Sequence, residues 1–243
     1  MTQQLVLVVE HAAQCPPGWV GEWLEEAGCV LDVRRPYAGD ELPDGLDRHR
    51  SLLVLGGPMD ADADEEHPWL PATRRLLTLA ARDGVPALGI CLGHQLAALA
   101  LGGSVHQNPR GPQIGVLDVG WWSAAKDDPL LGHVTGARAA VQWNNDVVGD
   151  VPPGAVVLAA TPEAEVQAAR FAPTVWGVQW HPEAGEEIVA PWADSDRASA
   201  AEKGIDVDER LAQVAAAHDG LRESWRPLAH TFAAMTRVVA ASW

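Results

Sequence analysis

The segment at residues 85–96 constrains the fold more than any other part of the sequence. An apolar run leads into Gly-Ile-Cys-Leu-Gly at 89–93, and apolar residues then recur at helical spacing, at Leu96, Leu99 and Ala100. A buried strand is therefore expected to stop at Cys91, where a helix starts. Glycines on both sides of the cysteine remove the β-carbons that would clash where a strand turns sharply into a helix. The sequence predicts a tight turn that presents a thiol.

Cys91 is placed to act as a nucleophile at such a turn. The N–H groups at the start of a helix have no acceptor within the helix, and their partial positive charge favours a thiolate. The alternative is that Cys91 is a small buried side chain at the end of a strand, which is common for a lone cysteine. Other residues have to decide between these two interpretations.

Composition narrows the class of protein. The chain has 243 residues, of which 47% are hydrophobic, enough for one α/β domain over 1–243 with its core at about 5–185. No run approaches the roughly 18 apolar residues of a membrane helix, and Met-Thr-Gln-Gln at the start lacks a basic flank, so a cytoplasmic protein is expected. The net charge of −16 argues against binding to nucleic acid or to an anionic membrane.

Three cysteines without a C-x-x-C pair suggest neither a disulfide framework nor a zinc site. Asp60, Asp62 and Asp64 alternate with alanine, as at the start of a calcium loop. However, Glu65 stands where that loop needs glycine, and Pro71 where it needs glutamate. A solvated acidic loop explains the pattern better, and no metal or other cofactor is expected.

Periodicity predicts alternating strands and helices in the first half of the chain and consecutive strands in the second. The expected strands are 5–9, 30–33, 51–55, 85–90, 104–107, 114–122, 139–143, 155–160, 166–171 and 175–180. The expected helices are 19–27, 69–82 and one after Cys91, then a helical region from 184 broken near 194–204, and helices at 208–217 and 221–241. This order predicts a parallel sheet with an antiparallel extension and C-terminal helices at about 186–243.

Two further motifs follow predicted strands. Leu55 runs into Gly56 and Gly57, whose bare backbone N–H groups suit an oxyanion or a ligand carboxylate. His181 and Glu183 stand at the end of the last strand, and because alternate strand residues face the same side, the two side chains are expected to meet. A nucleophilic cysteine acting on an amide needs such a base and a group that orients it. Alone, His181 would be read as an ordinary core or surface histidine.

Taken together, three segments resemble the class I (triad) glutamine amidotransferases, in particular the stand-alone group similar to the glutaminase domain of GMP synthase. These segments are Leu-Gly-Gly-Pro at 55–58, Gly-Ile-Cys-Leu-Gly-His-Gln at 89–95 and Gln-Trp-His-Pro-Glu at 179–183. The resemblance implies a three-layer αβα, flavodoxin-like fold with a mostly parallel central sheet and an antiparallel extension.

The resemblance also implies a reaction. Cys91 would attack the side-chain amide of glutamine, His181 would protonate the departing ammonia, and Glu183 would orient the imidazole. A γ-glutamyl thioester on the cysteine would then be hydrolysed to glutamate. The backbone N–H groups of Gly57 and Leu92 would form the oxyanion hole.

By the same resemblance, Gly56 and Gln95 would contact the substrate. One segment departs from the family: Trp-Asn-Asn-Asp at 143–146 replaces the frequent Trp-His-Gly-Asp, so Asn144 and Asn145 stand where histidine and glycine are usual. If this loop borders the site, the change could affect substrate fit or coupling to a partner.

The chain has no G-x-x-x-x-G-K-[ST] loop, so an ATP-activated ammonia acceptor is expected on a synthetase partner chain. Two alternatives remain open. The same three residues could hydrolyse another γ-glutamyl amide or peptide, with water as the acceptor, or the fold could serve as a non-catalytic binding or regulatory module. The acceptor and the oligomeric state cannot be derived from the sequence.

Overall fold

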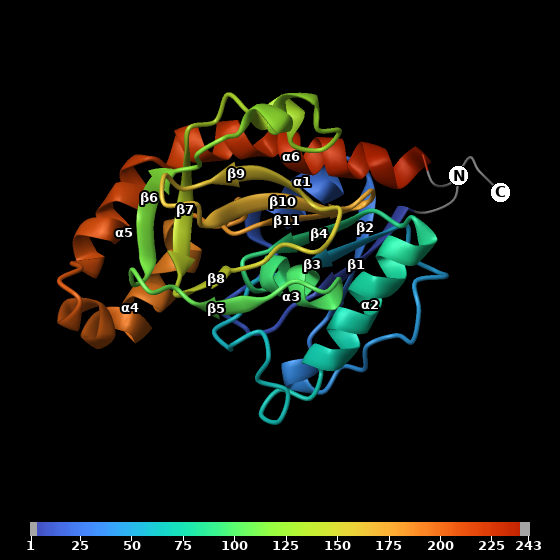
Figure 1. The fold of residues 1–243 in the computed structure, drawn as a ribbon, viewed down its shortest axis with the longest axis horizontal. Coiled ribbons are helices and arrows are strands. Elements are labelled where there is room, and N and C mark those ends of the chain that lie inside the picture. Colours follow the sequence, from blue (N-terminus) through green and yellow to red (C-terminus); the bar gives the residue numbers. More distant parts are fainter. Residues whose placement is uncertain (1–3, 239–243) are drawn as a thin grey trace.

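The computed structural model describes residues 4–238, and its centre is a nine-stranded mixed sheet between two layers of helices (Figure 1). Five strands are parallel, in the order β2 (Cys29–Arg34), β1 (Gln4–Val9), β3 (Ser51–Val54), β4 (Ala87–Ile90) and β11 (Val175–Val178). The antiparallel strands that continue it are β10 (Val166–Ala172), β8 (Asp146–Val148), β5 (Val105–Gln107) and β9 (Val156–Ala160), which pairs with β10.

The residues of β1 show why this strand is apolar from Leu5 to Val9. Val6 and Val8 belong to the hydrophobic cluster on one face of the sheet, and Leu7 and Val9 to the cluster on the other. Alternate side chains of a strand point to opposite faces, so a strand covered on both sides needs apolar residues at every position.

Helices cover both faces. The helices α1 (Gly18–Glu26) and α6 (His218–Val238) contact each other on one face, and α2 (Leu70–Asp83) and α3 (Leu92–Ala100) do so on the other. A separate antiparallel pair, β6 (Gln113–Asp118) and β7 (Ala139–Asn144), lies at one end of the molecule. The helices α4 (Glu186–Glu202) and α5 (Val207–Ala216) contact each other, and α5 packs on β6. Short 3₁₀ turns at Pro36–Ala38, Ser123–Asp127 and Gly132–Val134 complete the fold.

The α/β fold predicted from the sequence is confirmed, and four details differ. β8 was not predicted, and β11 pairs with parallel β4 as well as with antiparallel β10, so it joins the two halves of the sheet. β6 and β7 form their own small sheet. The helix α4 continues to Glu202, so the break expected near 194–204 is confined to the turn that begins at Lys203. Of the predicted closing helix at 221–241, residues 239–241 lie outside the described part.

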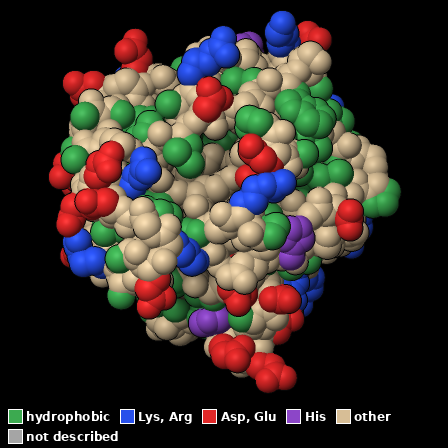
Figure 2. Space-filling view, turned by 60° about the vertical axis from the view of Figure 1, so that its left-hand side comes forward, with side chains coloured by type: hydrophobic (Ala, Val, Ile, Leu, Met, Phe, Trp, Pro, Cys, Tyr) green, Lys and Arg blue, Asp and Glu red, His purple; other side chains and the backbone are tan. Residues whose placement is uncertain are grey.

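The surface carries charges of both signs. On the face that Figure 2 shows, Lys and Arg side chains are scattered among Asp and Glu side chains and do not gather into one patch. In the acidic loop before α2, Asp64 pairs with Arg74 at 2.6 Å. Among residues 4–238 no cluster of three His, Cys, Asp or Glu side chains could hold a metal ion. None of the helices in this range is long and apolar enough to span a membrane.

Candidate active site

Cys91 lies at a strained turn between β4 and α3. Its backbone has φ 50° and ψ −104°, in a region that residues with a β-carbon rarely adopt. Its N–H donates to the Val178 carbonyl at 2.9 Å, and its carbonyl accepts from the Gln95 N–H at 3.1 Å. These bonds tie the turn to β11 and to the first turn of α3. Strain of this kind costs about 1–3 kcal/mol and persists where the surroundings hold it in place.

The two glycines beside Cys91 are required by close backbone approach. A β-carbon at Gly89 would collide with the Gly93 carbonyl, and one at Gly93 would collide with the Val54 carbonyl. The helix therefore starts directly against β3 and β4. The tight strand-to-helix turn predicted from the sequence is present. The two glycines are needed there for the steric reason on which the prediction was based.

His181 and Glu183 meet, but not as alternate residues of a strand. β11 ends at Val178, and both residues lie in the turn that follows it. The His181 N–H donates to the Val141 carbonyl at 2.8 Å, and the Glu183 carbonyl accepts from the Trp19 N–H at 3.0 Å. In this turn His181 Nδ1 lies 2.7 Å from Glu183 Oε1, and the side chains are only 3% and 1% exposed. The predicted contact is confirmed, and its backbone setting is corrected.

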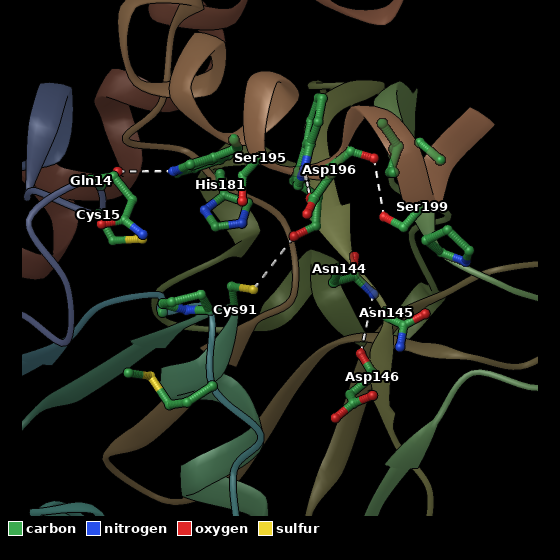
Figure 3. Close-up of a pocket in the computed structure, with 18 of the residues that line it drawn as sticks. Gln14, Cys15, Cys91, Asn144, Asn145, Asp146, His181, Ser195, Asp196 and Ser199 are labelled. Atoms are coloured by element: carbon green, nitrogen blue, oxygen red, sulfur yellow. Dashed lines mark hydrogen bonds between the residues drawn. The ribbon is translucent and has the colours of Figure 1, made fainter. Parts of the chain in front are cut away.

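The imidazole and the thiol converge on the backbone of Gly56. A β-carbon on this glycine would lie 3.1 Å from His181 Cε1 and 3.6 Å from Cys91 Cβ. Figure 3 shows the His181 ring and the Cys91 side chain facing the same cavity. His181 Nε2 is buried and has no hydrogen-bond partner among the described residues. With Nδ1 held by Glu183, Nε2 is the nitrogen free to exchange a proton with a group bound at the sulfur.

The charge of His181 follows from its neighbours. Burial lowers the pKa of His181, but the Glu183 carboxylate, followed by Cys91, outweighs burial and raises the pKa to about 10. The imidazole is therefore protonated near neutral pH. A protonated imidazole beside the sulfur favours the thiolate form and can donate a proton to a leaving group.

Two backbone donors lie at the same edge of the sheet. Within residues 4–238 neither the Gly57 N–H nor the Leu92 N–H donates to a protein acceptor. Gly57 follows β3 and lines the cavity, and Leu92 is the first residue of α3, directly after Cys91. Gln95 and Gly56 are the two residues expected to contact the substrate. Gln95 lines the cavity one turn further along α3. Gly56 lies next to the His181 ring and the Cys91 side chain.

The sulfur of Cys91 has neighbours that the sequence analysis did not single out. Gln179 Nε2 donates to Cys91 Sγ at 3.5 Å, and Gln95 Nε2 lies 3.4 Å from Gln179 Oε1. The Trp143 carbonyl lies 4.0 Å from the sulfur on the other side. The Trp192 ring packs against the His181 ring with centroids 4.6 Å apart. Gln179 belongs to the Gln-Trp-His-Pro-Glu segment at 179–183, so the sequence motif already included it. Trp192 and the other α4 residues lie outside the three motif segments, and no motif pointed to them.

The cavity over Cys91 has a volume of about 610 Å³. One wall comes from α4 and the residue that follows it, through Pro191, Trp192, Ser195, Asp196, Ser199, Ala200 and Lys203. Asp196 accepts a hydrogen bond from Trp143 Nε1 at 2.8 Å, which ties α4 to β7. Because ligand pockets span about 300–1,000 Å³, this space can hold a ligand larger than one amino acid.

A second cysteine, Cys15, also lines the cavity. Burial, followed by the nearby Cys91, Glu183 and Glu10, raises the pKa of the Cys15 thiol, and Trp192 offsets this only in part. Cys15 therefore stays a neutral thiol at neutral pH. Of the two thiols at the cavity, the one at the strained turn beside His181 is the nucleophile candidate.

The fold and this arrangement define a class of protein: an α/β protein with a cysteine, a histidine and a carboxylate at the carboxyl edge of a mostly parallel sheet. The family model for glutamine amidotransferase class-I matches residues 20–188. A glutamine amidotransferase-like protein of Salmonella typhimurium, YfeJ, is 33% identical over 171 residues, which are 69% of this chain and 71% of that protein. One subunit of the glutamine-hydrolysing GMP synthase of Methanosarcina barkeri is 42% identical over 157 residues, 61% of this chain and 71% of that subunit.

A solved structure agrees with these sequence relatives. The crystal structure of a glutamine amidotransferase from Thermotoga maritima superposes with a TM-score of 0.83 at 25% identity, covering 96% of this chain and 99% of that one. The chain belongs to the class I glutamine amidotransferase family. The resemblance stated from the three sequence segments is confirmed.

Proposed function

We propose that this chain hydrolyses the side-chain amide of glutamine through a γ-glutamyl thioester on Cys91 and releases glutamate and ammonia. The proposal rests above all on the 2.7 Å contact between His181 and Glu183, with His181 Nε2 unpartnered, among the described residues, at a cavity that also holds the Cys91 thiol. Membership of the amidotransferase family supports glutamine as the substrate.

The reaction proceeds in two halves. The Cys91 thiolate attacks the amide carbon, and the N–H groups of Gly57 and Leu92 stabilise the negative charge on the oxygen. Loss of one such donor typically costs on the order of 100 to 1,000-fold in rate. The C–N bond then breaks as protonated His181 gives its Nε2 proton to the leaving nitrogen, so that ammonia departs and the thioester remains.

In the second half, neutral His181 accepts a proton from a water molecule that attacks the thioester carbon. The C–S bond breaks, the thiolate is restored, and glutamate leaves the cavity. Glu183 holds Nδ1–H throughout, so Nε2 always faces the reacting atoms. Gln179 donates to the sulfur and stabilises its negative charge between turnovers.

We further propose that the ammonia serves a synthetase on another chain. One relative is named as a single subunit of GMP synthase, which supports an acceptor enzyme in a separate polypeptide. The free thiols of Cys15, Cys29 and Cys91 fit a reducing compartment such as the cytoplasm.

One observation favours a second candidate function. The α4 wall extends the cavity beyond the reacting atoms. This extension lies on the side of Trp192, whose ring packs against the His181 ring. His181 is the residue that protonates the leaving nitrogen. A γ-glutamyl amide with a larger amine could place that amine there, in which case water is the acceptor and no synthetase is needed. Steady-state rates for glutamine and for a series of γ-glutamyl amines distinguish the two substrates.

The test of the proposed chemistry is glutamate release by the purified chain, alone and with candidate synthetases. Wild type and Cys29→Ala are expected to turn over a γ-glutamyl substrate, and Cys91→Ala is expected to lose activity while keeping its circular dichroism spectrum. Cys29 is the matched control because it is also buried and free, but lies in β2 outside the cavity. Equal rates for Cys91→Ala and wild type would exclude the proposal.

A further inference from the structure

Trp192 of α4 is the tryptophan that packs on the His181 ring. The two ring centroids lie 4.6 Å apart, and the ring planes are tilted by 51°. Trp192 is 8% exposed and lines the cavity over Cys91. The proposed reaction assigns no part to this residue, although it contacts the side chain that has to move a proton.

The His181 side chain is tied by a hydrogen bond at one end only. The residue lies in the turn after β11, and its Nδ1 lies 2.7 Å from Glu183 Oε1. At the other end of the ring, Nε2 has no hydrogen-bond partner among the described residues. Rotation of the ring about the Nδ1 contact would carry Nε2 away from Cys91 unless packing prevents it. Packing on the ring therefore decides whether the reacting nitrogen stays in place.

The Trp192 ring is itself fixed by partners from other parts of the chain. Its Nε1 donates to the Gln14 carbonyl at 2.9 Å, in the loop before α1. Its ring lies 6.3 Å, centroid to centroid, from that of Trp143, whose Nε1 donates to Asp196 one turn further along α4. Figure 3 shows the His181 ring between the labelled Gln14 and Asp196. A side chain locked in this way can hold a neighbouring functional group in one orientation.

The charge on His181 adds an attraction to this packing. Besides Glu183, the titratable side chains at the cavity are Cys15, Asp60, Cys91, Asp146, Asp196 and Lys203. The strand β7, which accepts a hydrogen bond from the His181 N–H, contains no titratable residue. Glu183 and Cys91 outweigh burial and raise the pKa of His181 to about 10, so the imidazole is a cation near neutral pH. A cation within about 6 Å of a tryptophan ring centroid is attracted by the ring.

We propose that Trp192 is a positioning residue, which holds the His181 ring so that Nε2 faces the Cys91 sulfur. It acts through His181 and does not need to touch the reacting atoms. The kinetic part of this inference rests on the proposed function, because it assumes that His181 moves a proton at Cys91. The inference also gives α4 a role in the reaction, since this helix carries the ring that orients the imidazole.

The first experiment compares substitutions of Trp192 by steady-state kinetics with glutamine or the preferred γ-glutamyl amide. Trp192→Leu removes the ring, and Trp192→Phe keeps a ring but cannot donate to Gln14. Trp192→Met, a more adaptable side chain without a ring, replaces the leucine variant if that variant loses its circular dichroism spectrum. We expect kcat of Trp192→Leu to fall by about 10 to 100-fold, because displacement of a reacting group is costly. KM should change by less than about threefold, and kcat of Trp192→Phe should stay within about threefold of wild type.

A second experiment needs no turnover and therefore separates this inference from the proposed function. Iodoacetamide alkylates the thiolate form of cysteine, and a protonated imidazole at the sulfur favours that form. The readout is the ratio of Cys91 alkylation rates at about pH 7 and about pH 9.5, followed by mass spectrometry of the Cys91 peptide. A change in access to the cavity alters both rates alike and leaves the ratio unchanged. We expect the ratio to fall by about threefold or more in Trp192→Leu and to stay near the wild-type value in Trp192→Phe.

Trp121→Leu is the matched control. Like Trp192, Trp121 donates its Nε1 to a backbone carbonyl, that of Ala137, but it does not line the cavity. Its loss is expected to leave kcat and the alkylation ratio within about twofold of wild type. A general loss of packing would affect both variants, whereas loss of the contact with His181 affects only the Trp192 variant.

Three results would overturn the inference. The first is a Trp192→Phe variant as impaired as Trp192→Leu, because the Gln14 hydrogen bond would then matter and the ring contact would not. The second is an unchanged kcat in Trp192→Leu, with or without a rise in KM, which would leave Trp192 at most a substrate contact. The third is an equal fall in Trp121→Leu, or an alkylation ratio that does not change in Trp192→Leu. If wild type hydrolyses no γ-glutamyl compound, the proposed function fails, and the alkylation ratio alone decides the inference.

Discussion

Replacing Glu183 by glutamine tests how the site controls the charge of His181. The substitution keeps the shape of the side chain but removes a carboxylate that is 1% exposed and lies 2.7 Å from Nδ1. Because Glu183 is the largest contribution that raises the pKa of His181 against burial, its removal should bring that pKa from about 10 down to neutral or below. The glutamine amide can also donate to Nδ1 and stabilise the wrong tautomer.

Both effects act on the same step. Without a proton on Nε2 at neutral pH, the leaving nitrogen is poorly protonated and the thiolate loses its counter-ion. We expect kcat/KM for glutamine to fall by about 100 to 10,000-fold, which corresponds to about 2.7–5.4 kcal/mol of transition-state stabilisation. The high-pH limb of the rate profile should move to lower pH, since the proton donor is now lost earlier as pH rises.

The assay is glutamate release from about pH 5 to about pH 10.5 for wild type, Glu183→Gln and Glu10→Gln. Glu10 is the control because it is also a buried carboxylate, but its partners are Arg35 and Tyr37 and it does not line the cavity. Glu10→Gln should keep the wild-type profile. If Glu183→Gln stays within about threefold of wild type with an unshifted high-pH limb, the assigned role of His181 is wrong.

Three further predictions concern stability and substrate fit. Gly93→Ala should lower the free energy of unfolding by at least about 2 kcal/mol in urea denaturation, because its β-carbon would collide with the Val54 carbonyl. Burial lowers the pKa of His11 and of His94 to about 3, so below about pH 6.5 the unfolded chain binds protons that the folded chain does not. Unfolding at pH 5 should therefore be easier by about 2 kcal/mol per histidine than at pH 7, and a smaller pH slope is expected in His11→Gln. If the α4 wall binds the leaving amine, Ser199→Trp should reduce kcat/KM for a bulky γ-glutamyl amine more than for glutamine; equal losses would contradict that role.

The sequence predicted those features that local patterns determine. Continuous apolar runs identified the buried strands, and the glycines at 89 and 93 identified the turn at Cys91 because steric demand at such a turn leaves few alternatives. The meeting of His181 with Glu183 was also predicted, although the reason was a turn and not strand alternation. Pro182 and the hydrogen bond from the Trp19 N–H to the Glu183 carbonyl shape the backbone of this turn. Because Trp19 lies far from Glu183 in the sequence, local patterns could not predict the turn.

Features that depend on long-range packing were not predictable. The place of α4 over the cavity follows from the Trp143–Asp196 hydrogen bond and from packing of α4 on α5 and of α5 on β6. None of these contacts leaves a periodic signal. Likewise, the sequence shows β11 as one more strand in a series, and its pairing with β4 joins segments far apart in the chain. The departure at Asn144 and Asn145 was visible in the sequence, but the hydrogen bonds from Asn144 to Gln113 and from Gln113 to Glu165 join residues far apart in the chain.

The proposed chemistry requires that Cys91 form a covalent γ-glutamyl thioester with its substrate. The direct measurement is mass spectrometry of the Cys91 peptide after acid quenching of wild-type protein during turnover of glutamine or of the preferred γ-glutamyl amide. We expect a peptide heavier by one γ-glutamyl group, absent from Cys91→Ala and lost on treatment with hydroxylamine. Rapid turnover with no adduct on Cys91, and with activity retained in Cys91→Ala, would contradict it.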